Sequence, residues 1–339
     1  MASGPVLDVR GLRVSFRTPA GRQPAVRDIS FEIRSGEIVA LVGESGSGKS
    51  TTGLAIMGLL EGEDGAAVEG QIVLTGKSAT PQDLSRLPER ALRAIRGSDV
   101  AMIFQEPLSS LNPIYTIGSQ ICEAIRTHRT LPRREAQRDA LEALTQLGIP
   151  NPRACMEKYP HQLSGGMRQR VMIAMALACG PALLIADEPT TALDVTIQAQ
   201  IIDHLRRLQS KTGMSILFIT HNLGLVAEIA DRALVMYAGQ IVEAGPVDAV
   251  FQAPRMPYTR ALLGSLPRIG RTHRSGARLS AIPGNVPGLL TIPGGCSFHP
   301  RCVDVAAGLC DVRMPPLEDC GGDHRVRCLR WREIGGQLQ

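Results

Sequence analysis

The stretch from Gly43 to Ser50 has the residue types and spacing of a loop that binds polyphosphate, G-x-x-x-x-G-K-[ST]. Glycines at positions 43, 46 and 48 leave backbone N–H groups open to an anion, Lys49 brings a mobile positive charge, and Ser50 can ligate Mg²⁺. An ordinary Gly/Ser turn with an exposed lysine is the alternative. The expected phosphate-binding residues are Gly43, Glu44, Ser45, Gly46, Ser47, Gly48, Lys49, Ser50 and Thr51.

The segments on either side of this loop are those that the chemistry requires. An apolar run at residues 38–42 predicts a buried strand, and residues 51–57 predict a helix that begins directly after the loop. The positive end of that helix would face the bound anion.

Two carboxylates, Asp187 and Glu188, end a second apolar run at residues 182–186, and His221 follows a third run at residues 215–219. Asp187 can hold Mg²⁺, and Glu188 can polarise the water that attacks a γ-phosphate. A helix cap before Pro189 and a hydrogen-bonded loop histidine are the plain alternatives. Strands alternating with helices predict a parallel sheet, which carries ligands at the carboxyl ends of its strands.

The composition indicates a folded protein without membrane spans. The chain has 339 residues, of which 44% are hydrophobic and 20% charged, and its formal charge is +5. Its N-terminus has no basic segment followed by an apolar core, so we expect no export signal. The longest apolar run, residues 171–186, is interrupted by Gly180 and Pro181 and suits a buried helix and strand.

The remaining segments predict three further parts. Short β-type segments within residues 6–40 indicate a small antiparallel sheet, and residues 81–165 read as an amphipathic helical insertion. Beyond residue 250 the chain is rich in Pro, Gly and Arg, which indicates a loop-rich extension that needs an external staple.

The segment from Leu163 to Arg170, Leu-Ser-Gly-Gly-Met-Arg-Gln-Arg, resembles the signature of the ATP-binding-cassette (ABC) ATPases. This resemblance implies that Ser164, Gly165 and Gly166 bind the γ-phosphate of ATP held by an opposite subunit. A simple helix N-cap at Ser164 is the alternative, and the residue can do both.

Other positions resemble the same family one by one. Gln105 resembles the glutamine that reaches Mg²⁺ and water, His221 the switch histidine, and Asp194 the aspartate that communicates between paired sites. Phe16 stands where the family stacks an aromatic ring on adenine, although a core role suits it equally. The Mg²⁺ ligands implied are Ser50, Gln105 and Asp187, and the catalytic pair is Glu188 and His221.

The resemblance implies an α/β fold of the ABC type. It consists of a P-loop parallel sheet core, an antiparallel β subdomain and an α-helical subdomain at about 81–165, together forming a domain of residues 1–250. Residues 251–339 would be the C-terminal extension of the peptide-importer type.

Within the family, the chain most resembles the ATPase subunits of oligopeptide, dipeptide and nickel importers. The segments that carry this closer match are residues 43–50, 104–113, 159–166, 257–259 and 295–302. It implies a peripheral protein at the cytoplasmic face of the inner membrane, a second ATPase subunit, two permease subunits and an extracytoplasmic solute-binding protein, without nucleic acid. The alternatives are a soluble cassette acting on ribosomes or DNA, an ATP-binding regulator with little turnover, and a nickel chelate as the solute.

The cysteines crowd the C-terminal end at positions 296, 302, 310, 320 and 328. Four thiolates suffice for an iron–sulfur cluster or a zinc site. However, five residues separate Cys296 from Cys302 and seven separate Cys302 from Cys310, and neither spacing is the C-x2-C step of common zinc modules. The family resemblance favours a structural [4Fe–4S] cluster, and free thiols are the alternative. The ligands expected are Cys296, Cys302, Cys310 and Cys328, and Cys320 is a fifth thiol.

Overall fold

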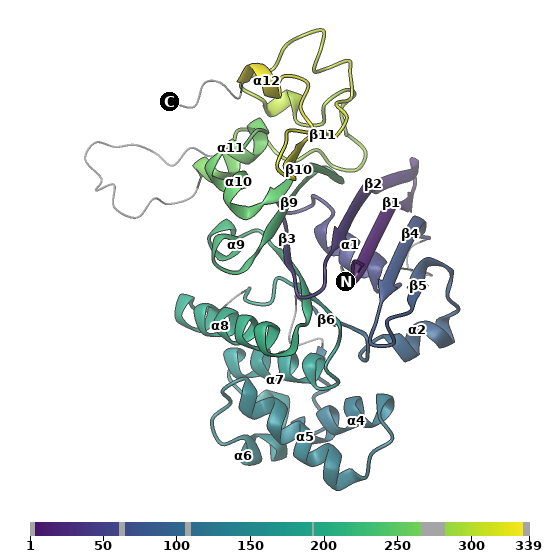
Figure 1. Cartoon of the computed structure of the whole chain (residues 1–339), viewed down its shortest axis with the longest axis vertical. Helices are drawn as coiled ribbons and strands as arrows, with labels where there is room; N and C mark the ends of the chain where they lie inside the picture. The colour runs from purple at the N-terminus through teal and green to yellow at the C-terminus, as the bar shows by residue number, and fades with distance from the viewer. Residues whose placement is uncertain (1–3, 61–64, 106–109, 192, 266–281, 335–339) are drawn as a thin grey trace, which may run out of the picture.

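The structure is a computed structural model that describes residues 4–60, 65–105, 110–191, 193–265 and 282–334. It contains two sheets, a set of helices at one end of the molecule and the C-terminal extension at the opposite end (Figure 1). In the described part of the chain, no helix is long and apolar enough to cross a membrane.

The main sheet lies at the centre of the molecule. Its strand order is β11-β12-β10-β9-β3-β8-β7-β6, and the strands from β9 to β6 run parallel. The strand bounds are β3 (Ile38–Val42), β6 (Val100–Ile103), β7 (Leu183–Asp187), β8 (Ser215–Thr220), β9 (Arg232–Tyr237), β10 (Gln240–Pro246), β11 (Glu318–Asp319) and β12 (Arg325–Val326). The predicted parallel sheet is confirmed.

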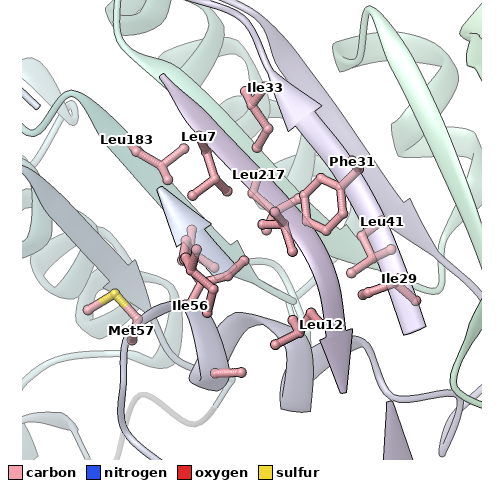
Figure 2. Packing of buried hydrophobic residues seen from close by; sticks show 14 of the residues in the cluster. Leu7, Leu12, Ile29, Phe31, Ile33, Leu41, Ile56, Met57, Leu183 and Leu217 are labelled. Atoms are coloured by element: carbon pink, nitrogen blue, oxygen red, sulfur yellow. The ribbon is translucent and has the colours of Figure 1, made fainter. Parts of the chain in front are cut away.

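A smaller antiparallel sheet packs beside the main sheet, with the strand order β2-β1-β4-β5. Its strands are β1 (Leu7–Thr18), β2 (Gly21–Ile33), β4 (Ala67–Thr75) and β5 (Pro81–Asp83). Leu7, Leu12 and Ile29 from this sheet share one buried cluster with Ile56 of helix α1 (Lys49–Ile56) and Leu217 of β8 (Figure 2). The helix that follows the phosphate loop is thus held between the two sheets.

The helical part lies at the lower end in Figure 1. Its elements are α4 (Ile117–His128), α5 (Arg133–Gln146), α6 (Pro152–Glu157), η2 (Pro160–Gln162) and α7 (Gly165–Leu177). Within the range of about 81–165 expected to be helical, β5 instead belongs to the antiparallel sheet and β6 to the main sheet, with η1 (Leu84–Arg86) and α2 (Glu89–Ile95) between them. The four apolar residues of β6 are all buried between β7 and the helices. An apolar run this short has no periodicity that distinguishes a strand from a helix in the sequence.

The C-terminal extension is packed onto the main sheet. Its elements are α11 (Pro257–Gly264), η3 (His299–Arg301), the β11–β12 hairpin and α12 (Trp331–Ile334), and α8 (Val195–Thr212), α9 (Leu223–Ile229) and α10 (Val247–Gln252) precede it. Tyr258, Phe298 and Val326 share a buried cluster with Val42 and Tyr237. The loop-rich extension therefore shares its buried core with the main sheet.

Candidate functional site

The phosphate loop lies between β3 and α1, and its glycines have conformations that other residues rarely adopt. Gly43 has φ 154° and Gly48 has φ 101°. A Cβ atom on Gly43 would lie 2.1 Å from the carbonyl oxygen of Met236, and one on Gly48 would lie 2.7 Å from that of Ala25. The loop therefore fits its neighbours only without side chains at these positions.

Lys49 is held over the loop. Its Nζ donates to the carbonyl oxygens of Gly43 and Glu44, both at 2.9 Å. Burial lowers the pKa of Lys49, while Glu188 and Asp187 oppose that shift. The ammonium is therefore a poorly solvated positive charge beside loop N–H groups, as an anion site requires.

Asp187 is the last residue of β7 and is only 4% exposed. Ser50 donates from its Oγ to Oδ1 of Asp187 at 3.1 Å. Burial raises the pKa of this carboxyl, and the hydrogen bond from Ser50 partly offsets that effect. A hydroxyl and a buried carboxylate so close together make an oxygen donor set that suits Mg²⁺.

Three side chains form hydrogen bonds with the carboxylate of Glu188. Gln105 Nε2 donates to its Oε2 at 3.1 Å, Thr191 Oγ1 donates to the same oxygen at 2.8 Å, and His221 Nδ1 lies 2.9 Å from Oε1. Burial raises the pKa of Glu188, but the hydrogen bonds from His221 and Thr191 outweigh it and leave that pKa below its ordinary value. The carboxylate is therefore ionised at neutral pH and can accept a proton.

The structure thus brings together Lys49, Ser50, Gln105, Asp187, Glu188 and His221 at the carboxyl ends of β3, β7 and β8 and just beyond β6. Thr191 was missed by the sequence reasoning. The signal available for it was its position three residues after Glu188, where a hydroxyl can reach back to the carboxylate.

The signature residues lie at a different place. Ser164, Gly165, Gly166 and Asp194 line one cleft of about 680 Å³, and none of residues 43–51 lines it. Ser164 accepts a hydrogen bond from Met167 N at 3.4 Å and caps α7, while Asp194 caps α8 in the same way. The signature residues and the phosphate loop are therefore at separate places within one chain.

Phe16 lies in β1 and packs, half-buried, against the core cluster of the antiparallel sheet. Its stacking on adenine stays a prediction. After Gln105, residues 106–109 lie outside the described part of the chain, and Ile114 and Tyr115 are exposed.

The profile described as "ABC transporter" matches residues 26–191, and the one described as "Oligopeptide/dipeptide transporter, C-terminal region" matches residues 242–310. A Brucella melitensis protein named for peptide import and ATP binding is 56% identical over 337 residues, which is 98% of this chain and 99% of that protein. The chain belongs to the ABC transporter family. The dipeptide transport ATP-binding protein DppD of Escherichia coli is also similar to this ABC ATPase, with 48% identity over 95% of this chain and 96% of DppD.

Solved structures support the same assignment of the fold. The dimeric structure of the ABC transporter cassette MJ0796 matches this ABC ATPase with TM-score 0.63 and 26% identity, over 71% of this chain and 98% of that one. A second dimeric structure of MJ0796, described as a post-hydrolysis state, is bound to ADP and Pi and matches at 25% identity with TM-score 0.63. The predicted ABC fold and ATP hydrolase activity are confirmed, and a ribosome- or DNA-acting cassette is not favoured.

The iron–sulfur prediction is wrong. Cys296, Cys302, Cys310 and Cys328 line a common cavity of only about 20 Å³. In the described residues, however, no group of three or more His, Cys, Asp or Glu side chains is arranged to hold a metal ion. The prediction assumed that the loop-rich extension needs a bound cluster to hold it in place. The buried cluster that contains Phe298 already packs the extension onto the sheet without one.

Proposed function

We propose that this ABC ATPase is the subunit that powers import of dipeptides or oligopeptides through a membrane complex. The observation that carries the proposal is the ionised Glu188, held by His221 and Gln105 beside the Lys49 loop, in a chain whose extension matches the oligopeptide/dipeptide transporter region. The names of its relatives support peptides as the solute class.

In the proposed reaction, the N–H groups of residues 43–51 and the Lys49 ammonium bind the phosphates of ATP. Glu188 accepts a proton from the water that attacks the γ-phosphorus, while the bond from that phosphorus to the bridging oxygen breaks and ADP leaves. His221 orients Glu188 through their hydrogen bond. Ser50 and Asp187 would hold Mg²⁺, with Gln105 as a further ligand after closure, and the ion would neutralise phosphate charge.

The proposed assembly pairs two like subunits. Each Lys49 loop would face the Ser164 cleft of the other subunit, because the two halves are separate within one chain. Two permease subunits and an extracytoplasmic solute-binding protein complete the proposed complex, with the ATPase on the cytoplasmic face of the inner membrane. The proposed domains are residues 1–250 for the cassette and 251–339 for the extension.

Uptake of labelled peptides tests this function. Cells that lack this chain but keep its membrane partners would be complemented with the parent or with the Glu188→Gln variant. The parent should restore uptake of a labelled di- or oligopeptide, and the variant should not. Equal peptide uptake with and without the chain would contradict peptide import, and a labelled nickel chelate would then test the remaining solute.

A further inference from the structure

The C-terminal extension reaches into the phosphate loop through Arg301. This side chain is 6% exposed, and it donates from Nη1 to Oε2 of Glu44 at 2.8 Å and from Nη2 to Oε1 at 3.0 Å. Glu44 is the second residue of the loop. Both carboxylate oxygens are therefore bound by an arginine that is 257 positions away in the sequence.

A second residue of the extension holds the backbone of the same loop residue. The N–H of Glu44 donates to the hydroxyl of Tyr258 at 2.9 Å. The Tyr258 ring is fully buried and lies 4.7 Å from the ring of Tyr237 and 5.3 Å from that of Phe298. The hydroxyl that accepts this hydrogen bond is thus carried by a ring packed against two other aromatic rings.

The arginine is as rigidly placed as the tyrosine. Its Nε donates to the carbonyl oxygen of Pro283 at 2.8 Å, and its guanidinium lies 5.8 Å from the centre of the Tyr237 ring and 6.0 Å from that of Phe298. The hydrogen bonds with Glu44 raise the pKa of Arg301. The permanently charged guanidinium of Arg301, itself held by these contacts, therefore fixes the Glu44 carboxylate.

Lys49 also binds Glu44, because its Nζ donates to the Glu44 carbonyl oxygen. The carboxylate, the N–H and the carbonyl oxygen of one loop residue are thus all engaged. Movement of Glu44 would displace the acceptor that orients the Lys49 ammonium, and with it the N–H groups of the neighbouring loop residues.

We propose that Arg301 and Tyr258 are positioning residues for the ATPase reaction, which hold the phosphate loop in its nucleotide-binding shape before ATP arrives. This inference rests on ATP binding at the Lys49 loop, as proposed above. The C-terminal extension, which shares a buried core with the main sheet, is then also part of the nucleotide site.

A preorganised loop improves the binding of the ground state and of the transition state alike. Loss of the fixed loop shape should therefore weaken the affinity for nucleotide. For Arg301→Gln, we expect the Kd for ADP and the KM for ATP to rise by about tenfold, with kcat changing by less than about threefold. Tyr258→Phe keeps the packed ring and removes only the acceptor oxygen, and we expect a rise of about threefold. Arg301→Lys keeps the charge without the fork and should recover part of the affinity.

The matched control is Arg332→Gln, which removes an arginine of the same extension whose ion pair with Glu318 lies on the surface. It should keep the parental Kd and KM. In the double variant Glu44→Gln with Arg301→Gln, the effects should be far from additive, because each single change breaks the same ion pair.

If Arg301 and Tyr258 only stabilise the fold, Arg301→Gln and Tyr258→Phe would lower the melting temperature and leave the Kd for ADP at the parental value. That result would overturn the inference. If Arg301→Gln does not fold, Tyr258→Phe decides on the same criterion. A parent protein that binds neither ADP nor ATP would contradict the proposed function itself, which makes the two failures distinguishable.

Discussion

Glu188 has a backbone conformation that is rare for a residue with a side chain. Its φ is 46°, in the left-handed region, directly after the last residue of β7. Its N–H donates to the carbonyl oxygen of Ile219 at 2.9 Å, which fixes the turn. Such a conformation costs on the order of 1–3 kcal/mol and is kept where surrounding contacts impose it. Here it directs the carboxylate toward His221 and Gln105.

Replacing Glu188 by Gln should abolish most hydrolysis without loss of nucleotide binding. The amide has nearly the same shape but cannot accept the proton of water, so we expect kcat to fall by about 10²–10⁴-fold. A phosphate-release assay and ADP titration measure the two quantities. Turnover close to that of the parent would contradict the role assigned to Glu188.

Cys302 and Cys328 of the extension should react slowly with iodoacetamide. Burial raises the pKa of Cys302 to about 12 and that of Cys328 to about 11, so both thiols keep their protons at pH 8. Because only the thiolate reacts, labelling of the folded chain should be about tenfold or more slower than that of the urea-unfolded chain. It should accelerate as the pH rises toward 11 and 12.

Mass spectrometry of the labelled peptides follows each cysteine separately. Equal labelling rates for the folded and unfolded chains at pH 8 would show that these thiols ionise freely and would contradict the assigned burial effect.

Residues at strand ends were predictable from the sequence, because the phosphate loop, the Asp187–Glu188 pair and His221 each come soon after an apolar run. That is why Lys49, Asp187, Glu188 and His221 could be expected at one edge of the sheet. Arg301 could not be linked to the phosphate loop in this way. Its partner lies in a distant part of the chain, and only the packing of the extension brings the two together.

At the scale of elements, the phosphate loop depends on close contact with two neighbouring segments. Gly239 N donates to the Ser47 carbonyl oxygen at 2.9 Å, and Arg27 N donates to the Gly239 carbonyl oxygen at 2.7 Å. The loop is thus linked to the β9–β10 turn and to β2. Its shape is a property of three elements and not of its own sequence alone.

The variant Gly48→Ala should distort this arrangement. Its Cβ would lie 2.7 Å from the Ala25 carbonyl oxygen at a φ of 101°, so we expect a loss of about 1–3 kcal/mol in the free energy of unfolding together with weaker ADP binding. Urea unfolding and ADP titration measure these effects.

Gly264→Ala in α11 is the matched control, because a Cβ there would meet no atom within 4 Å and φ lies outside the left-handed region. Its stability should be unchanged or slightly higher. If Gly48→Ala were as stable as this control and bound ADP normally, the close contacts would not constrain the loop.

Long apolar strands were the predictable elements, and short or interrupted ones were not. Every residue of β3, β7 and β8 is buried, and each strand contains an unbroken run of apolar residues in the sequence. The two-residue strands β11 and β12 carry charged residues such as Glu318 and Arg325 and have no period to detect. Their pairing follows from the position of β10, which the local sequence does not encode.

At the scale of the whole molecule, the separation of the two half-sites predicts ATP-dependent pairing. The Glu188→Gln variant, which retains ATP, should form a dimer when saturated with MgATP. Adding Ser164→Arg should prevent it, because a large charged side chain would occupy the cleft that receives the opposite subunit. Light scattering after size-exclusion chromatography measures the mass.

A Glu188→Gln protein that stays monomeric at saturating MgATP would contradict pairing with itself, and the same measurement would then be made with a paralogous ATPase subunit added. A Ser164→Arg double variant that still forms the dimer would contradict the placement of the signature at the interface.

The β11–β12 hairpin is the last part of the main sheet to leave the ribosome. Until residue 326 emerges, β10 has β9 on one side and lacks the antiparallel partner that pairs with Glu243 and Ala244 on the other. Exposed strand edges pair with other chains. Truncated mRNAs that end before the codon for residue 318 should therefore yield products that aggregate or bind chaperones. A hairpin of two-residue strands thus covers the edge of β10 that would otherwise be open.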